Sequence, residues 1–295
     1  MRNQGNQQYE THVHRQSTTM SSANSLPQSN IRSSRQSKNR TSSPERPSSL
    51  TSTTSTRSTR SRKTYDHMEI HKYMGQYKHV VGIDEVARGS LAGRLYTAAV
   101  ILPETFPDDE YKSIRDSKTL SAKQRERLCT YIEKHAIAYA VDYAEVEEID
   151  QYNVLNATMR SMHRAVDALM EQLDGRIVPE FIMVDGPKFP NYVWVGDDEK
   201  EITIPHECIN KGDATYRNIA AASILAKVYH DTYIHRLVEE HPEYEKYGWK
   251  SNMCYGTAAH IKAIREHGVT ELHRKSFGIC KDAVAFDTFR EDTDE

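Results

Sequence analysis

Short hydrophobic runs and longer periodic stretches alternate along the chain from residue 79 onward. The run at 79–83 is too short for a helix and rich in β-branched residues, which predicts a buried strand. Runs of the same kind predict further strands at 95–102, 137–141, 181–184 and 202–204. Strands separated by helical patterns predict an α/β fold, in which a sheet is flanked by helices and ligands collect at strand ends.

The helical patterns begin and end at recognisable residues. Ser121 and Gln124 have the spacing of a capping box, which predicts a helix over 122–135. Apolar residues step by three or four over 154–173, which predicts an amphipathic helix that stops at Asp174 and Gly175. Two more helices are expected at 215–239 and 257–267, and Gly268 ends the second of them.

The first 63 residues differ sharply from the rest in composition. They contain 25 Ser or Thr, no Phe or Trp, and 11 basic against 2 acidic residues, so their net charge is +9 and that of the remainder −12. Such a segment cannot bury enough apolar surface to fold. We therefore expect a disordered basic tail over 1–75 and one folded domain over 76–295. The tail would attract polyanions, and the alternatives are an inert spacer or a phosphorylated regulatory segment.

Several classes of protein are disfavoured by the rest of the composition. The N-terminal residues lack the apolar face of an organelle transit helix, and no run is long enough to span a membrane. The four cysteines form no Cys-x-x-Cys pair, which argues against a zinc site and suits reduced thiols. We expect a monomer in the cytoplasm, or in the nucleus if the source cell has one.

Acidic residues follow several of the predicted strands. Asp84 and Glu85 end the first run, Asp185 ends the run at 181–184, and Asp213 precedes a long helix. Each residue alone is typical of a solvated strand end, a turn or a helix cap. Carboxylates at the ends of different strands can converge on one edge of a sheet, where a hard cation collects oxygen ligands.

Six motifs in order across residues 79–280 resemble the type 2 ribonucleases H, and ribonuclease HII in particular. They are the segments 82–93, 116–121, 184–186, 211–228, 255–257 and 273–277. Each motif is weak alone, whereas their order and spacing are specific. The resemblance implies an α/β ribonuclease H-like fold, with a mixed sheet flanked by helices, following the disordered N-terminal tail.

The resemblance also implies an activity and its ligands. Cleavage of the RNA strand of RNA–DNA hybrids, and incision 5′ of ribonucleotides embedded in duplex DNA, would leave 3′-hydroxyl and 5′-phosphate ends. Two Mg²⁺ or Mn²⁺ ions would activate the water, neutralise the phosphate and stabilise the leaving oxygen. The residues that match the family's catalytic metal ligands are Asp84, Glu85, Asp185 and Asp213.

Other matching residues would contact the substrate. The segment Ala87, Arg88 and Gly89 would approach the 2′-hydroxyl, and Tyr255 would stack beside the junction sugar. A core aromatic is the plain alternative for Tyr255. Lys118, Lys211 and Lys227 would contact phosphates or the carboxylates, and solvated lysines are an equally good interpretation of all three.

The chain departs from the family at several positions. Ala87 replaces a glycine, Arg94 replaces a proline, and 251–254 replaces a segment with Lys, His and Gly, which puts substrate recognition in doubt but leaves the carboxylates unchanged. No clamp-binding peptide is evident at 285–289. A binding protein without activity, a proofreading exonuclease and a type 3 ribonuclease H are the alternatives. Intact carboxylates disfavour the first, and the Ser/Thr-rich tail disfavours the last.

Overall fold

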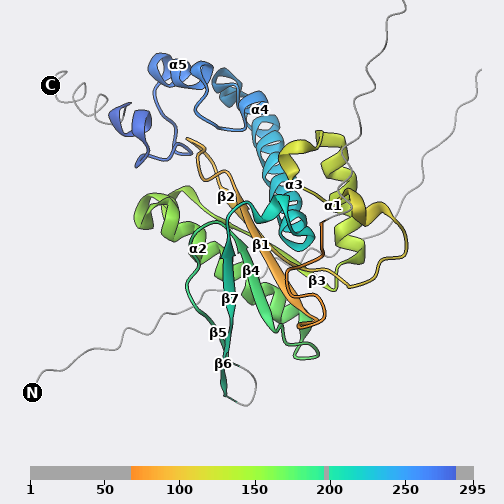
Figure 1. Ribbon diagram of the computed structural model, residues 1–295. Coiled ribbons are helices and arrows are strands. Elements are labelled where there is room, and N and C mark those ends of the chain that lie inside the picture. Colours follow the sequence, from red (N-terminus) through yellow and green to blue (C-terminus); the bar gives the residue numbers. More distant parts are fainter. Residues whose placement is uncertain (1–67, 196–198, 284–295) are drawn as a thin grey trace, which may run out of the picture. The chain divides into compact units, whose positions relative to one another are not determined.

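The computed structural model describes residues 68–195 and 199–283, and its centre is a five-stranded sheet in the order β3-β2-β1-β4-β7 (Figure 1). β1 pairs antiparallel with β2 and parallel with β4, so the sheet is mixed. β3 extends it antiparallel on one side and β7 extends it parallel on the other. The strands are β1 (Val80–Val86), β2 (Leu95–Ile101), β3 (Ala138–Ala144), β4 (Phe181–Asp185) and β7 (His206–Ile209).

Helices cover both faces of this sheet. Alternate residues of β2 show why, because Ala99 and Ile101 pack in the cluster with α2, whereas Ala98 and Val100 pack with α1 and α3. The α/β fold predicted from the sequence, a mixed sheet flanked by helices, is therefore confirmed. The helices are α1 (Ala122–His135), α2 (Val146–Leu173), α3 (Arg217–Glu240), α4 (Trp249–Asn252) and α5 (Ala258–His267).

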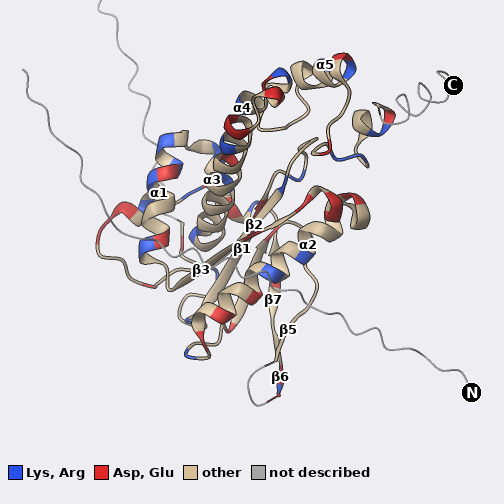
Figure 2. Cartoon of the chain, turned by 180° about the vertical axis from the view of Figure 1, so that it is seen from behind, with Lys and Arg blue, Asp and Glu red and all other residues tan. Residues whose placement is uncertain are grey.

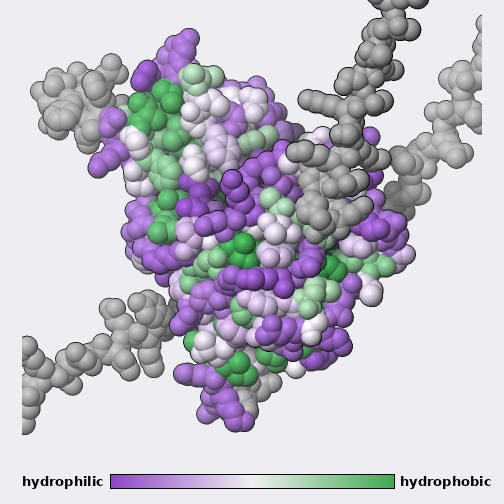
Figure 3. All heavy atoms as spheres, in the orientation of Figure 1, coloured by the Kyte–Doolittle hydropathy of each residue, from purple (hydrophilic) through white to green (hydrophobic). Residues whose placement is uncertain are grey.

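A second layer of packing lies beyond the C-terminal half of α3. There α4, α5 and the 3-10 helix η4 (Pro242–Tyr247) enclose Trp249 and Tyr247, both almost completely buried. At the other end of the molecule, β5 (Tyr192–Val195) and β6 (Glu201–Ile204) form a separate hairpin, near which apolar residues reach the surface (Figure 3). Charged residues lie mainly on helices and loops, and the central strands are largely uncharged (Figure 2).

Most predicted helix boundaries agree with the structure. Both halves of the capping box of Ser121 and Gln124 are present at the start of α1. Helix α2 differs, because it begins at Val146, before the predicted start. Asn153 interrupts it with a φ of 64°, and the Asn153 Oδ1 accepts hydrogen bonds from the next amides. The predicted start at residue 154 therefore marks the second segment of α2, after an internal cap.

The predicted boundary between tail and domain, after residue 75, lies too far along the chain. Met68 and Ile70 are buried, and the carbonyls of Glu69 and Ile70 accept from the amides of Arg217 and Asn218. This segment thus covers backbone donors at the start of α3, which the helix itself leaves without partners. The predicted disorder of the preceding tail falls on residues 1–67, outside the described residues.

Two further predictions concern cysteine chemistry and membranes. All four cysteines are free, as expected for reduced thiols. Within residues 68–195 and 199–283, no helix is both long and apolar enough to cross a membrane.

Gly82 lets α3 lie directly against β1. A Cβ on Gly82 would be 2.4 Å from the Asn218 carbonyl carbon and 2.7 Å from the Ile219 amide nitrogen. Both are backbone atoms at the start of α3, so no side chain can rotate away to make room. The strand and the helix can keep this contact only while position 82 lacks a side chain.

We expect Gly82→Ala to destabilise the domain by about 3 kcal/mol or more, because overpacking against backbone cannot relax cheaply. Gly278→Ala is the matched control, since a Cβ there meets nothing within 4 Å. Urea denaturation followed by circular dichroism measures both free energies of unfolding. Equal stability of the two variants would contradict the contact.

Candidate active site

The predicted acidic residues lie at the ends of neighbouring strands. β1 and β4 are parallel neighbours, so Asp84 and Glu85 of β1 lie at the same edge of the sheet as Asp185 of β4. Gly82 and Asp84 share the face of β1 that contacts α3, whereas Glu85 points to the opposite face. Asp213 lies in the 3-10 helix η3 (Gly212–Ala214), which connects β7 to α3.

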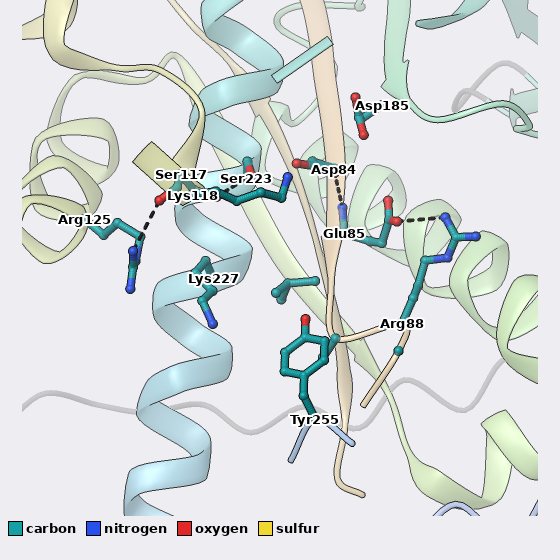
Figure 4. Close-up of a pocket in the computed structure, with 13 residues that line it drawn as sticks. Asp84, Glu85, Arg88, Ser117, Lys118, Arg125, Asp185, Ser223, Lys227 and Tyr255 are labelled. Atoms are coloured by element: carbon teal, nitrogen blue, oxygen red, sulfur yellow. Dashed lines mark hydrogen bonds and ion pairs between the residues drawn. The ribbon is translucent and has the colours of Figure 1, made fainter. Parts of the chain in front are cut away.

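A pocket of about 440 Å³ opens at this edge (Figure 4). Of the predicted site residues, the structure brings nine to its lining: Asp84, Glu85, Ala87, Arg88, Gly89, Lys118, Asp185, Lys227 and Tyr255. Asp213 does not line it but bonds to Lys118. Lys211 lies outside the lining, exposed and in a left-handed conformation before η3.

Four lining residues were not predicted to be in the site: Val86, Ser117, Arg125 and Ser223. The Ser117 and Ser223 hydroxyls are 2.9 Å apart and link the segment before α1 to α3. Both serines stand within matched motifs, and this was the only signal in the sequence. Arg125 donates to the carbonyls of Ser117 and Leu120, which fixes the same segment.

Burial and mutual repulsion act on the carboxylates. The pKa of Asp84 is raised well above its usual value by burial and by the charges of Glu85 and Asp185, against hydrogen bonds from the Ser223 hydroxyl and the Glu85 amide. The pKa of Asp185 is also raised, by burial and then by Asp213, although the Gly212 amide donates to its Oδ1 at 2.7 Å. Negative charge at this edge is therefore only partly compensated.

Two cations offset part of this charge. Arg88 Nη1 lies 2.9 Å from Glu85 Oε1, and Lys118 Nζ lies 2.9 Å from Asp213 Oδ2. Burial lowers the pKa of Lys118, but the hydrogen bond to Asp213 and the charges of Asp213, Asp84 and Asp116 together raise it above its usual value. Four carboxylates thus face two basic groups, and the buried Glu85 Oε2 has no hydrogen-bond partner.

The donor set fits a hard divalent cation. It consists of carboxylate oxygens, carries excess negative charge, and includes the unpaired Glu85 oxygen. Across the described ranges, no group of three or more His, Cys, Asp or Glu side chains is already arranged to hold a metal ion. Arg88 and Lys118 each bond a single carboxylate oxygen, Glu85 Oε1 and Asp213 Oδ2, so Glu85 Oε2 stays available to a cation while Arg88 is in place.

Tyr255 and the segment 87–89 form the wall opposite the carboxylates. The Tyr255 ring is 36% exposed, and a Cβ on Gly89 would lie 3.8 Å from its Cε1, an ordinary contact. Packing therefore does not require glycine at position 89, so its missing side chain leaves space in the pocket. Ala87 has a φ of 69°, a left-handed conformation that favours glycine.

Known proteins resemble this chain both in sequence and in fold. A family profile described as ribonuclease HII matches residues 81–280. The ribonuclease HII of Christiangramia forsetii is 44% identical over 208 residues, covering 70% of this chain and 94% of the relative. That of Parabacteroides distasonis is 43% identical over 212 residues, covering 72% of this chain and 96% of the relative.

Solved structures share the fold at lower identity. The ribonuclease H2 of Pyrococcus horikoshii superposes with a TM-score of 0.56 at 23% identity, covering 72% of this chain and 99% of that one. The Bst ribonuclease HIII in complex with Mn²⁺ gives 0.53 at 19% identity, covering 72% of this chain and 71% of that one. The solved structures share the fold alone. The profile match and the relatives from C. forsetii and P. distasonis place the chain in the ribonuclease HII family of metal-dependent endonucleases, which cleave the RNA of RNA–DNA hybrids.

Proposed function

We propose that this ribonuclease HII cleaves the RNA strand of hybrids and incises 5′ of ribonucleotides embedded in duplex DNA, leaving 3′-hydroxyl and 5′-phosphate ends. The observation that carries the proposal is the composition of one pocket. The carboxylates Asp84, Glu85 and Asp185 line the same cavity as Gly89 and Tyr255, and the Tyr255 ring lies apart from the carboxylates in it (Figure 4). A scissile phosphate beside the carboxylates would therefore place its sugar near the opposite wall.

Asp84, Glu85, Asp185 and Asp213 are the proposed metal ligands. Two Mg²⁺ or Mn²⁺ ions would supply an activated water, neutralise the phosphate and stabilise the leaving 3′ oxygen. Lys118 holds Asp213 in the structure and lines the pocket, so its release would place a mobile ammonium group where the phosphate binds. Its proposed role is thus to keep Asp213 oriented until metal and substrate arrive.

The opposite wall would distinguish RNA from DNA. A 2′-hydroxyl both donates and accepts hydrogen bonds, and the backbone at Ala87, Arg88 and Gly89 offers partners for both. Because packing leaves room at Gly89, a sugar can approach this backbone closely. The Tyr255 ring, which the Gly89 position faces, would stack on the neighbouring sugar and sense the junction.

We expect Asp84→Asn to lower cleavage by several orders of magnitude and to raise the melting temperature of the metal-free protein. The substitution removes a metal ligand and also the repulsion that raises the Asp84 pKa. Mn²⁺ should raise the melting temperature of the wild type, and raise that of Asp84→Asn far less. Asp174→Asn is the control, because Asp174 caps α2 in a left-handed conformation that asparagine also adopts. Near wild-type cleavage by Asp84→Asn would refute the ligand assignment.

Stability and activity should respond to pH in opposite directions. Asp84 and Asp185 have raised pKa values in the folded protein, so folding binds their protons more tightly than the unfolded chain does. The metal-free protein should gain stability as pH falls from neutrality toward about 4, the ordinary carboxyl range. Activity should fall over the same interval, because protonated carboxyls do not bind metal. Melting curves and initial rates measured across this range test both trends. Asp84→Asn should make the stability of the metal-free protein less dependent on pH.

Tyr255→Ala should reduce kcat/KM on a duplex with one ribonucleotide more than on an all-RNA hybrid. Loss of one stacking ring costs about 1–3 kcal/mol, or roughly 5- to 150-fold. Tyr255→Phe keeps the ring and should retain most of the preference. Equal losses on the two substrates would show that Tyr255 does not read the junction.

A further inference from the structure

Arg274 is a fully buried cation that is bonded to backbone carbonyls. Its Nε and Nη2 donate to the Gly93 carbonyl at 3.0 and 2.9 Å, and its Nη1 donates to the carbonyls of Ala87 and Arg88 at 2.8 and 3.2 Å. Burial lowers the pKa of Arg274 to about 10. A buried charge is costly to keep, so these bonds hold the turn at 87–93 at a considerable desolvation cost.

These bonds also fix the direction of the pocket-lining amides. A planar trans peptide points its carbonyl and its N–H in opposite directions. Since the Ala87 and Arg88 carbonyls point at Arg274, the N–H groups of Arg88 and Gly89 point away from it. Arg274 therefore determines which way this wall of the pocket presents its donors.

The neighbouring residue, His273, is connected to Tyr255 by a second series of hydrogen bonds. The His273 Nδ1 accepts from the Thr270 amide at 2.8 Å, so its proton is on Nε2, which donates to His260 Nε2 at 3.3 Å. The Trp249 indole also donates to His260 Nε2, at 3.0 Å. The His260 proton is therefore on Nδ1, which donates to the Tyr255 carbonyl at 3.0 Å.

Both histidines are neutral in this arrangement. Each is completely buried, and burial together with His260 lowers the pKa of His273 to about 3. Protonation of His260 Nε2 would place a new N–H against the N–H groups of Trp249 and His273, which already donate to this nitrogen. The chain from Thr270 to Tyr255 thus has a single consistent direction of donation.

Short backbone contacts join the two chains of bonds. Ser90 forms an isolated antiparallel β-bridge with Tyr255, and Ala92 forms one with His273. Between them, the Leu91 carbonyl accepts a hydrogen bond from the Arg274 amide at 2.8 Å. The turn after β1 is therefore held between the Tyr255 segment and the segment at 272–274. A shift of either His273 or Arg274 would therefore move the turn after β1, and with it the segment 87–89 and its contact with Tyr255.

We propose that His260 and Arg274 are positioning residues, which set the Tyr255 backbone and the amides of the 87–89 segment for substrate. The inference rests on the proposed function, because it assigns these residues to the wall that would read the sugar. Neither residue lines the pocket, so both act through the residues that do.

The sharpest test compares two amides at position 260. Asparagine places its amide near the position of Nδ1 and can still donate to the Tyr255 carbonyl. Glutamine reaches the position of Nε2 and keeps the Trp249 and His273 contacts, but it loses the bond to Tyr255. We expect His260→Gln to lower kcat/KM about tenfold on the substrate that Tyr255→Ala affects most, and His260→Asn to lower it less than about threefold.

Each outcome decides a separate question. Equal losses in the two variants, after correction for folded fraction by circular dichroism, overturn the positioning role of His260. If Tyr255→Ala affects both substrates equally, junction reading fails, yet the Gln–Asn contrast still decides positioning. If Tyr255→Ala has no effect on either substrate, both the proposed wall and its positioning are wrong.

Arg274→Lys tests the other chain of bonds. One ammonium group cannot reach the Gly93 and Ala87 carbonyls as the guanidinium does. Misdirected amides should raise KM on both substrates by about tenfold, whereas a merely structural loss lowers the active fraction and leaves KM unchanged. An unchanged KM overturns the role of Arg274, and if the variant does not fold, the His260 pair decides the proposal.

Discussion

The contact between α3 and β1 at Gly82 is the constraint from which the site follows. The absence of a side chain at position 82 lets the start of α3 lie on the strand, and a run of alanines, Ala220–Ala222, continues the close packing. Asp84 is the next residue on the same face, so it is buried beside Ser223 of α3. A bulkier contact at Gly82 would move the carboxylate away from the helix that hydrogen-bonds it.

The same burial makes the site unfavourable to the free protein. Burial acts on both Asp84 and Asp185, while Asp84 is exposed to the charges of Glu85 and Asp185, and Asp185 to those of Asp213 and Glu85. Arg88 and Lys118 bond to Glu85 and Asp213 and offset only part of this charge. A divalent cation bound at the proposed ligands would relieve the repulsion, which the folded protein otherwise carries at the expense of its own stability. Function and stability therefore compete at this edge of the sheet.

The sequence was sufficient for the features that depend on local pattern. The strand before Asp84, the capping box at Ser121 and the helix stop after residue 267 were predicted because period and cap chemistry are read within a few residues. The contacts of Lys118 and Lys211 were not predictable in this way. Both follow or precede acidic residues, and only the tertiary fold places Lys118 on Asp213 while leaving Lys211 exposed.

The strand β7 and the packed segment at 68–75 illustrate the same limit. β7 is four residues long and contains His206 and Glu207, so its pattern has little hydrophobic signal. Its pairing with β4 becomes favourable only when the rest of the sheet exists. Met68 and Ile70 likewise are isolated apolar residues in a polar segment, and they become core residues because α3 offers them a surface.

The departures from the family are explained by tertiary bonds that replace local preference. Ala87 replaces a glycine of the motif that its segment resembles, and Cys254 belongs to the departing segment 251–254; both have a left-handed φ, of 69° and 62°, at a cost of about 1–2 kcal/mol each. Arg274 bonds the Ala87 carbonyl, and the Asn252 side chain and the Leu91 amide bond the amide and carbonyl of Cys254. The backbone at both positions is thus held by the hydrogen bonds around it, so residues with a side chain keep a left-handed conformation that glycine adopts more readily.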